Sequence, residues 1–170
     1  MPSKHASKSK RNKPYRPRDV QADAAAWAMA GVYTLPLQTQ IDVLTPVYAA
    51  VLLLKQGKAT REDWNIIAQS LNVAEALAGL QIGPNLMPII AAGQRTLIDI
   101  ALRMIETGKS TCYAHELAAI DEAIVMTRAQ LQLCTQAELS RALARVKDLH
   151  RSGHMKDVAD IYDRMHAGHA

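Results

Sequence analysis

The sequence predicts an all-α protein: a single compact helical domain of six or seven helices, preceded by a disordered basic N-terminal arm. Apolar residues make up 49% of the 170 residues, but only 4% are aromatic and phenylalanine is absent. Leu, Ile, Ala, Val and Met must therefore fill the core, which is typical of packed helices. These residues recur at spacings of three and four, and no stretch alternates as a half-buried strand does.

The arm comprises residues 1–18, which carry seven Lys and Arg side chains and no acid, a net charge of +7. Residues 19–170, the predicted helical domain, hold 13 basic and 16 acidic residues. A segment this charged and this poor in apolar side chains cannot bury enough surface to offset the entropy lost on ordering. We therefore attribute the basic character of the chain to the arm alone.

The first predicted helix is Ala-rich and runs from Asp19, a candidate N-cap, to about residue 32, with Trp27 as its one large anchor;. The second spans residues 37–56 and repeats apolar side chains every three or four positions. Pro46 lies inside this second helix, where it is expected to start, kink or split it.

The clearest helix opens at "TRED", where Thr60 and Asp63 form a capping box, and runs to about residue 81;. One face carries Trp64, Ile67, Ala68, Leu71, Ala74 and Ala78. Val73, Leu77 and Leu80 widen this apolar stripe, so we expect the helix to be buried on two sides.

A fourth helix is expected over residues 86–107, capped by Asn85 and stopped by Gly108;. Gly79 and Gly93 fall inside predicted helices, where glycine costs about 1 kcal/mol against alanine. Close approach of a neighbouring helix is the simplest explanation for both glycines.

The fifth predicted helix covers residues 111–134, and a second capping box at Thr135 and Glu138 opens a sixth that ends near residue 151;. A last segment, residues 154–165, has one apolar side and can dock as a short helix.

Metal ligation finds little support in the sequence. "HELAAI", residues 115–120, lacks the second histidine of the zinc-protease pattern, because position 119 is Ala;. Four histidines near the C-terminus are interpreted as exposed and solvated: His150, His154, His166 and His169. We expect no metal and no cofactor.

Nucleophilic catalysis is also not expected. Cys112, Tyr113 and His115 are close in sequence but cannot all face one another on a helix. Cys112 and Cys134 are interpreted as reduced thiols, and Cys112 as a small buried side chain near a helix start. If both lie on one continuous helix, about 33 Å separates them, too far for a disulfide.

Two carboxylates within apolar runs, Glu75 and Asp99, are candidates for partly buried groups that pair with Arg95 or Arg103. Asp99 and Arg103 have the i, i+4 spacing of a helical ion pair. A functional acid in a cleft is the alternative interpretation of either carboxylate. We predict that the chain is not an enzyme.

The start of the chain lacks the apolar stretch that a signal peptide has behind its first charges. The strongest apolar run, "VYAAVLLL" at residues 47–54, is too short to cross a bilayer;. The cytoplasm, of a cell or of an infected host, is therefore the expected location, without a membrane partner.

The arm is the feature that points to a function, because its cations can neutralise phosphates of DNA or RNA. Tyr15 lies between two prolines, Pro14 and Pro17, and can stack on an exposed base. The predicted nucleic-acid-binding residues are Lys8, Lys10, Arg11, Lys13, Tyr15, Arg16 and Arg18. Docking on an acidic protein surface and a merely solubilising role are the two alternatives.

"KPYRPRDV" (13–20), "EDWNIIAQSLNVAEALAGL" (62–80) and the Leu- and Gln-rich "EAIVMTRAQLQL" (122–133) resemble short helical proteins encoded by phages and prophages of proteobacteria. The resemblance implies a small accessory protein of a mobile element. We expect a non-enzymatic protein that binds nucleic acid or a nucleoprotein complex through its arm. The alternative is an inhibitor or adaptor that binds a host protein, for example of a defence system, through its helical surface. Self-association as a homo-oligomer is compatible with both.

Overall fold

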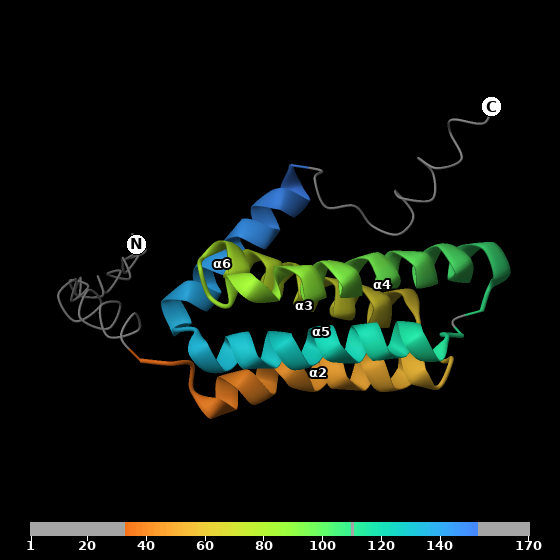
Figure 1. Cartoon of the computed structure of the whole chain (residues 1–170), viewed down its shortest axis with the longest axis horizontal. Helices are drawn as coiled ribbons and strands as arrows, with labels where there is room; N and C mark the ends of the chain where they lie inside the picture. The colour runs from red at the N-terminus through yellow and green to blue at the C-terminus, as the bar shows by residue number, and fades with distance from the viewer. Residues whose placement is uncertain (1–32, 110, 153–170) are drawn as a thin grey trace, which may run out of the picture.

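The structure is a computed structural model that describes residues 33–109 and 111–152 (Figure 1). This part of the chain forms α2 (Leu37–Lys55), α3 (Arg61–Gly79), the 3-10 turn η1 (Pro84–Leu86), α4 (Met87–Thr107), α5 (Ala114–Leu133) and α6 (Gln136–Arg151). The all-α prediction is confirmed, since the described residues contain no strand beyond one isolated bridge between Thr34 and Thr135.

The number of helices differs from the prediction, because the described residues form five α-helices instead of six or seven. The two further helices were expected over residues 19–32 and 154–165. Both segments lie outside the described residues, as does the predicted arm.

Helix α3 is the centre of the fold and packs against α2, α4, α5 and α6. On one side Trp64, Ile67 and Leu71 join a core cluster shared with α2, α4 and α5. On the other side Val73 and Leu77 join a second cluster, which includes the buried face of α6. The prediction that this helix is buried on two sides is confirmed.

Two of the helices begin at the predicted capping boxes. The backbone N–H of Thr60 donates to Asp63 Oδ2 at 2.8 Å, and the N–H of Asp63 donates back to Thr60 Oγ1 at 3.3 Å. Thr135 and Glu138 repeat the arrangement at 2.8 and 3.2 Å. Each box satisfies backbone donors that the first helical turn leaves without a partner.

Three local expectations are corrected. Asn85 does not cap α4, since it lies inside η1 and Leu86 occupies the cap position without a side-chain bond. Helix α5 begins at Ala114 and not at residue 111. Pro46 does not split α2, which is continuous from Leu37 to Lys55. Pro46 is on the exposed side, where water can solvate the carbonyl that proline leaves without its usual donor;.

The two helical glycines have different explanations. A Cβ at Gly93 would lie 2.6 Å from Ala123 Cβ, so the close approach of α4 and α5 requires glycine there;. A Cβ at Gly79 would meet only Arg145 Nη1 at 3.6 Å, an ordinary contact with a flexible side chain. The prediction of close helix packing is therefore confirmed for Gly93 and wrong for Gly79.

Candidate functional site

The seven residues predicted to bind nucleic acid all belong to residues 1–18 and lie outside the described residues. The structure does show where the N-terminal part of the chain joins the helical body. Leu35 is buried and its N–H donates to the carbonyl of Cys134 at 2.9 Å, beside the bridge from Thr34 to Thr135. The chain therefore enters the body at the corner between α5 and α6, next to the cap of α6.

Helix α6 carries a set of exposed cations that the sequence analysis did not single out. Its exposed basic side chains are Arg141, Arg145, Lys147 and Arg151. Between Leu139 and Arg151 the only acid is Asp148, so this stretch has a net charge of +3. The described residues as a whole hold 11 basic and 11 acidic residues, which leaves the rest of the described body at −3. Because basic and acidic residues balance over the described body, its net charge does not reveal this basic helix.

The packing of α6 explains why these cations face solvent. Leu139 and Ala142 are buried against the α3 side of the second core cluster, and Val146 packs beside them. The apolar positions 139, 142 and 146 form one narrow face, because they repeat every three or four residues. The remaining face is exposed and carries the charges.

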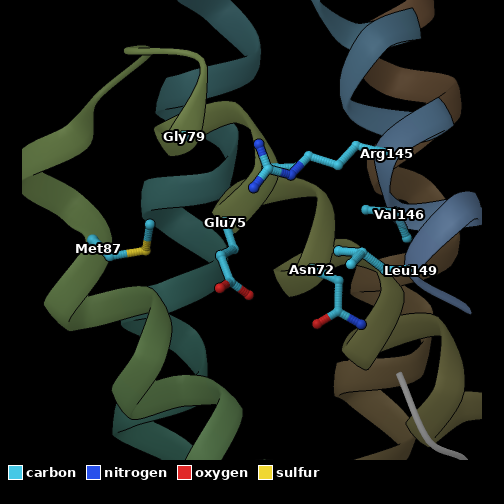
Figure 2. Close-up of a pocket in the computed structure, with 8 residues that line it drawn as sticks. Asn72, Glu75, Gly79, Met87, Arg145, Val146 and Leu149 are labelled. Carbon is cyan, nitrogen blue, oxygen red and sulfur yellow. The ribbon is translucent and has the colours of Figure 1, made fainter. Parts of the chain in front are cut away.

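An open hollow of about 240 Å³ lies between α3, the start of α4 and α6 (Figure 2). Arg145 extends across it from α6, beside Gly79, and the Glu75 carboxylate faces into it from α3. The apolar part of its wall includes Met87 and Leu149. The lining of the hollow therefore contains one cation and one anion together with apolar side chains.

Glu75 is exposed, and its position is set by an amide and not by the predicted arginines. Gln94 Nε2 donates to Glu75 Oε2 at 2.9 Å and to Asn72 Oδ1 at 3.1 Å. The expected pairing of Glu75 with Arg95 or Arg103 is thus wrong: Gln94 contacts Glu75, and Arg103 pairs with Glu116. The alternative interpretation was a functional acid in a cleft. Glu75 does line a cavity, but this cavity is the open hollow between α3, α4 and α6.

The strongest ionic contact in the described residues joins Arg103 of α4 to Glu116 of α5. Arg103 donates from Nη1 to Glu116 Oε1 at 2.9 Å and from Nη2 to Oε2 at 2.6 Å. It also donates to the carbonyl of Thr111 at 3.1 Å and lies 4.6 Å from the ring centroid of Tyr113. Bidentate pairs of this kind are among the stronger hydrogen bonds in proteins.

The predicted ion pair between Asp99 and Arg103 is wrong. Asp99 is exposed, whereas Arg103 turns towards the first turn of α5 and pairs there with the buried Glu116. The Arg103 hydrogen bonds lower the pKa of Glu116 and the same contact raises the pKa of Arg103. The N–H of Tyr113 also donates to Glu116 at 2.7 Å. The Glu116 carboxylate therefore links α4 to α5 through Arg103 and accepts a hydrogen bond from the N-cap residue of α5.

The cysteines and histidines of the described residues form no cluster. Cys112 and Cys134 lie at opposite ends of α5, and burial raises the pKa of both thiols, that of Cys134 to about 11. A thiol with such a pKa is protonated near neutral pH and is a poor nucleophile. His115 and His150 are exposed, and no three His, Cys, Asp or Glu side chains within the described ranges are grouped to hold a metal.

Helix α2 exposes a row of apolar side chains, Leu37, Ile41, Tyr48 and Leu52, which we call the α2 stripe. Val125 and Leu133 are exposed on α5, which packs beside α2. Among the described helices, α2 is also the one that is long and apolar enough to cross a membrane by length and composition alone. In this structure its other face belongs to the core, through Leu44, Val47 and Val51.

Comparison with known proteins finds no matching family model, no matching curated protein and no matching solved structure.

Proposed function

We propose that this chain is a non-enzymatic phage- or prophage-type accessory protein that binds nucleic acid, or a nucleoprotein complex, through residues 1–18 together with α6. The separation of charge supports this proposal. Residues 1–18 carry +7 and residues 139–151 carry +3, whereas the rest of the chain holds nine basic and 15 acidic residues. Such a distribution favours contact with a polyanion on the two basic regions and disfavours it elsewhere.

The hydrogen bond from Leu35 to Cys134 is the observation that links the two basic regions. It holds the chain entry next to the first turn of α6, whose 16 residues extend about 24 Å;. Residues 19–32 separate the arm from this point, and 14 residues span at most about 50 Å. A connection of this length allows the arm and α6 to contact the same nucleic-acid segment.

Binding of this type is expected to position the protein without reading sequence. Lys and Arg contacts with phosphates release counterions, so the logarithm of the binding constant falls with the logarithm of salt by about 0.9 for each phosphate contacted on duplex DNA. Such contacts carry no base information by themselves. Tyr15 is the residue expected to add a preference for unpaired strands, by stacking on a base.

The test is a salt series of binding to short DNA and RNA duplexes and single strands. Full-length protein, a variant without residues 1–18, and Arg141→Gln with Arg145→Gln are compared. The matched control is Lys58→Gln with Lys109→Gln, two exposed cations in loops of the body. The salt slope should fall strongly without the arm and by about 1 to 2 in the α6 variant, and should stay unchanged in the control.

Two results would contradict the proposal. Absence of binding at low salt by the full-length protein would exclude nucleic acid as the partner of the arm. An equal loss in the α6 variant and the control would mean that net charge alone, and not the position of α6, sets the affinity.

The alternative function is an inhibitor or adaptor that binds a host protein through the helical surface. The α2 stripe favours it, because contiguous exposed apolar side chains are typical of protein interaction sites. The two functions separate cleanly in one comparison. If the protein without residues 1–18 still binds its partner, and Ile41→Glu abolishes that binding, the alternative is supported. If removal of residues 1–18 abolishes binding and Ile41→Glu does not, nucleic-acid binding is supported.

A further inference from the structure

The open hollow between α3, the start of α4 and α6 is lined by two opposite charges that do not pair with each other. Within the described residues the side chain of Arg145 makes no hydrogen bond or ion pair, although Glu75 lines the same hollow. Glu75 accepts a hydrogen bond at Oε2 from Gln94. A carboxylate has about four acceptor positions in all, so Glu75 keeps acceptor capacity for a further donor.

Gln94 of α4 fixes the anionic side of the hollow. Its Nε2 donates to Glu75 Oε2 at 2.9 Å and to Asn72 Oδ1 at 3.1 Å. Asn72 and Glu75 both line the hollow, so this one amide restrains two polar groups of the wall (Figure 2). A side chain that is already held in place loses less conformational entropy when a ligand binds, which favours binding.

Arg145 of α6 forms the cationic side of the hollow. Its Nη1 lies 3.6 Å from the position that a Cβ at Gly79 would occupy, so the guanidinium lies close to the end of α3. Gly79 has no side chain to displace it from there. The guanidinium carries five N–H donors in a planar fork, an arrangement that matches the two oxygens of a carboxylate.

Apolar side chains make up much of the remaining wall. Met87 comes from the start of α4, and Val146 and Leu149 come from α6, so apolar surface faces the hollow from two helices (Figure 2). Leu149 is 37% exposed, and a ligand that covers it removes apolar surface from water;. The volume of about 240 Å³ is below the range of about 300–1,000 Å³ for drug-sized ligands. The hollow therefore suits a ligand of amino-acid size.

The two charges together limit the class of ligand that the hollow accepts. A small anion inside the hollow is attracted by Arg145 but repelled by Glu75, and a small cation experiences the reverse. A purely apolar ligand removes water from both charged groups without replacing its hydrogen bonds, which is unfavourable. A ligand that carries one charge of each sign, together with an apolar part, is complementary to the whole lining.

We propose that the hollow binds a small zwitterion with an apolar part, of the class of free α-amino acids with an aliphatic side chain. The carboxylate of the ligand accepts hydrogen bonds from Arg145, and its ammonium group donates to Glu75. The aliphatic side chain lies against the apolar wall that includes Leu149. The site is separate from the proposed function, because it does not involve residues 1–18 and binds no nucleic acid.

The first test titrates L-leucine into the isotope-labelled full-length protein, without nucleic acid, and follows the backbone amides by two-dimensional NMR. The amide signals of residues that line the hollow, such as Ala76 and Val146, should shift and saturate. The signal of Thr111, in the α4–α5 connection at the other end of the bundle, should not shift (Figure 1). Because both charged side chains are exposed, a dissociation constant on the order of millimolar is expected;.

Two derivatives of leucine test the two charges separately. L-leucinamide lacks the carboxylate and N-acetyl-L-leucine lacks the ammonium group, so each should bind about three- to tenfold more weakly than leucine. Arg145→Gln should weaken leucine binding by a similar factor and leave leucinamide binding unchanged. Glu75→Gln should weaken leucine binding and leave N-acetyl-leucine binding unchanged. This matching of ligand and variant is specific to the proposed orientation of the ligand.

The matched control variants are Arg141→Gln on α6 and Glu62→Gln on α3. Both side chains are exposed and neither lines the hollow. The controls remove the same charges from the same two helices, so they should bind leucine as the wild type does. Thermal melts followed by circular dichroism check that all four variants are folded.

Three results would overturn the proposal. The first is the absence of saturable shifts with leucine, including the case in which shifts occur only after removal of residues 153–170, because the chain's own C-terminal segment would then occupy the hollow. The second is equal binding of leucine and both derivatives. The third is an equal loss in the site variants and the controls, which would assign the effect to net charge. Because these measurements contain no nucleic acid, the site and the proposed function can fail independently.

Discussion

Helices α3 and α6 pack against each other, but α3 is largely buried and α6 is largely exposed to solvent. Helix α3 is buried on two sides, between the cluster around Trp64 and the cluster around Leu77. Helix α6 is buried along one narrow face only, through Leu139 and Ala142. The difference shows a division of roles within the body: α3 has little surface left for a partner and organises the fold, whereas α6 can present charge.

The same comparison explains the distribution of the charges. On α3 the charged side chains are confined to the first turn and to the exposed Glu75. On α6 four cations occupy the face opposite the core. If the two helices have these separate roles, substitutions in α3 and around it should change stability, and substitutions on α6 should change binding alone.

The largest loss of stability is expected from Trp64→Ala. The side chain is 5% exposed, and its Nε1–H donates to the carbonyl of Leu97 at 2.7 Å. Removing it leaves a cavity and deletes this buried hydrogen bond, which should lower the free energy of unfolding by about 3–5 kcal/mol. Urea denaturation measures this value. A nearly neutral result would mean that α3 does not organise the core.

Glu116→Gln should cost about 3 kcal/mol at neutral pH, because it leaves the cation of Arg103 without its buried partner. The pKa of Glu116 is lowered in the folded protein, chiefly by Arg103. The unfolded chain therefore binds the proton first as pH falls. The stability from this pair is present above the ordinary Glu pKa of about 4.3 and is lost as pH falls through the folded value.

The pH dependence is the sharper measurement of this pair. The difference in unfolding free energy between the wild type and Glu116→Gln should narrow as pH falls from neutral towards about 3. A difference that stays constant over this range would mean that the carboxylate is not ionised in the folded protein.

Two glycine substitutions test packing with opposite expected signs. Gly93→Ala should destabilise by about 1–3 kcal/mol, because its methyl group would lie 2.6 Å from Ala123 Cβ;. Gly79→Ala should be neutral or stabilise by up to about 1 kcal/mol, since alanine is the better helix former and the site is open;. Thermal melts of both variants give the comparison, and equal losses would contradict it.

On α6, Arg141→Gln with Arg145→Gln should change the unfolding free energy by no more than about 0.5 kcal/mol. Both side chains are exposed, and the contact of Arg141 within the described residues is a 3.4 Å bond to the carbonyl of Ala137 in its own helix. Denaturation and binding are measured on the same sample. A large loss of stability would make α6 a second organising helix and would weaken the argument for a binding role.

The smallest effect is expected from removal of residues 1–18, which should leave the melting temperature nearly unchanged. The segment offers few apolar side chains to bury;. A drop of many degrees in a thermal scan would show that these residues contribute to the fold.

The predictions that succeeded rest on local signals. Both capping boxes are short-range exchanges of hydrogen bonds between a Thr and an acid three residues later, so the helix starts at Thr60 and Thr135 are readable without tertiary information;. Gly108 ends α4 with a positive φ of 68°, a conformation that glycine adopts readily;. The two-sided burial of α3 follows from the width of its apolar stripe.

Two of the predictions that failed, the ion pairs of Glu75 and Asp99, involve a choice among partners. Asp99 has the correct spacing for Arg103, but Glu116 is held nearer by the start of α5. Gln130 gives a similar example, as it is fully buried and donates to the carbonyls of Ala74 and Ile82, far away in sequence. Spacing along one helix cannot reveal a competitor on another.

The sequence by itself determined the helical class, the helix starts at Thr60 and Thr135, the end of α4 at Gly108, the central role of the Trp64 helix and the basic character of residues 1–18. Each depends on composition or on residues within one or two turns of one another. The tertiary structure alone decided which helix faces are covered: that α2 keeps an apolar row in solvent, and that α6 turns its cations outward beside the point where the chain enters the body. Exposure depends on which helices become neighbours, and that is a property of the whole packed chain.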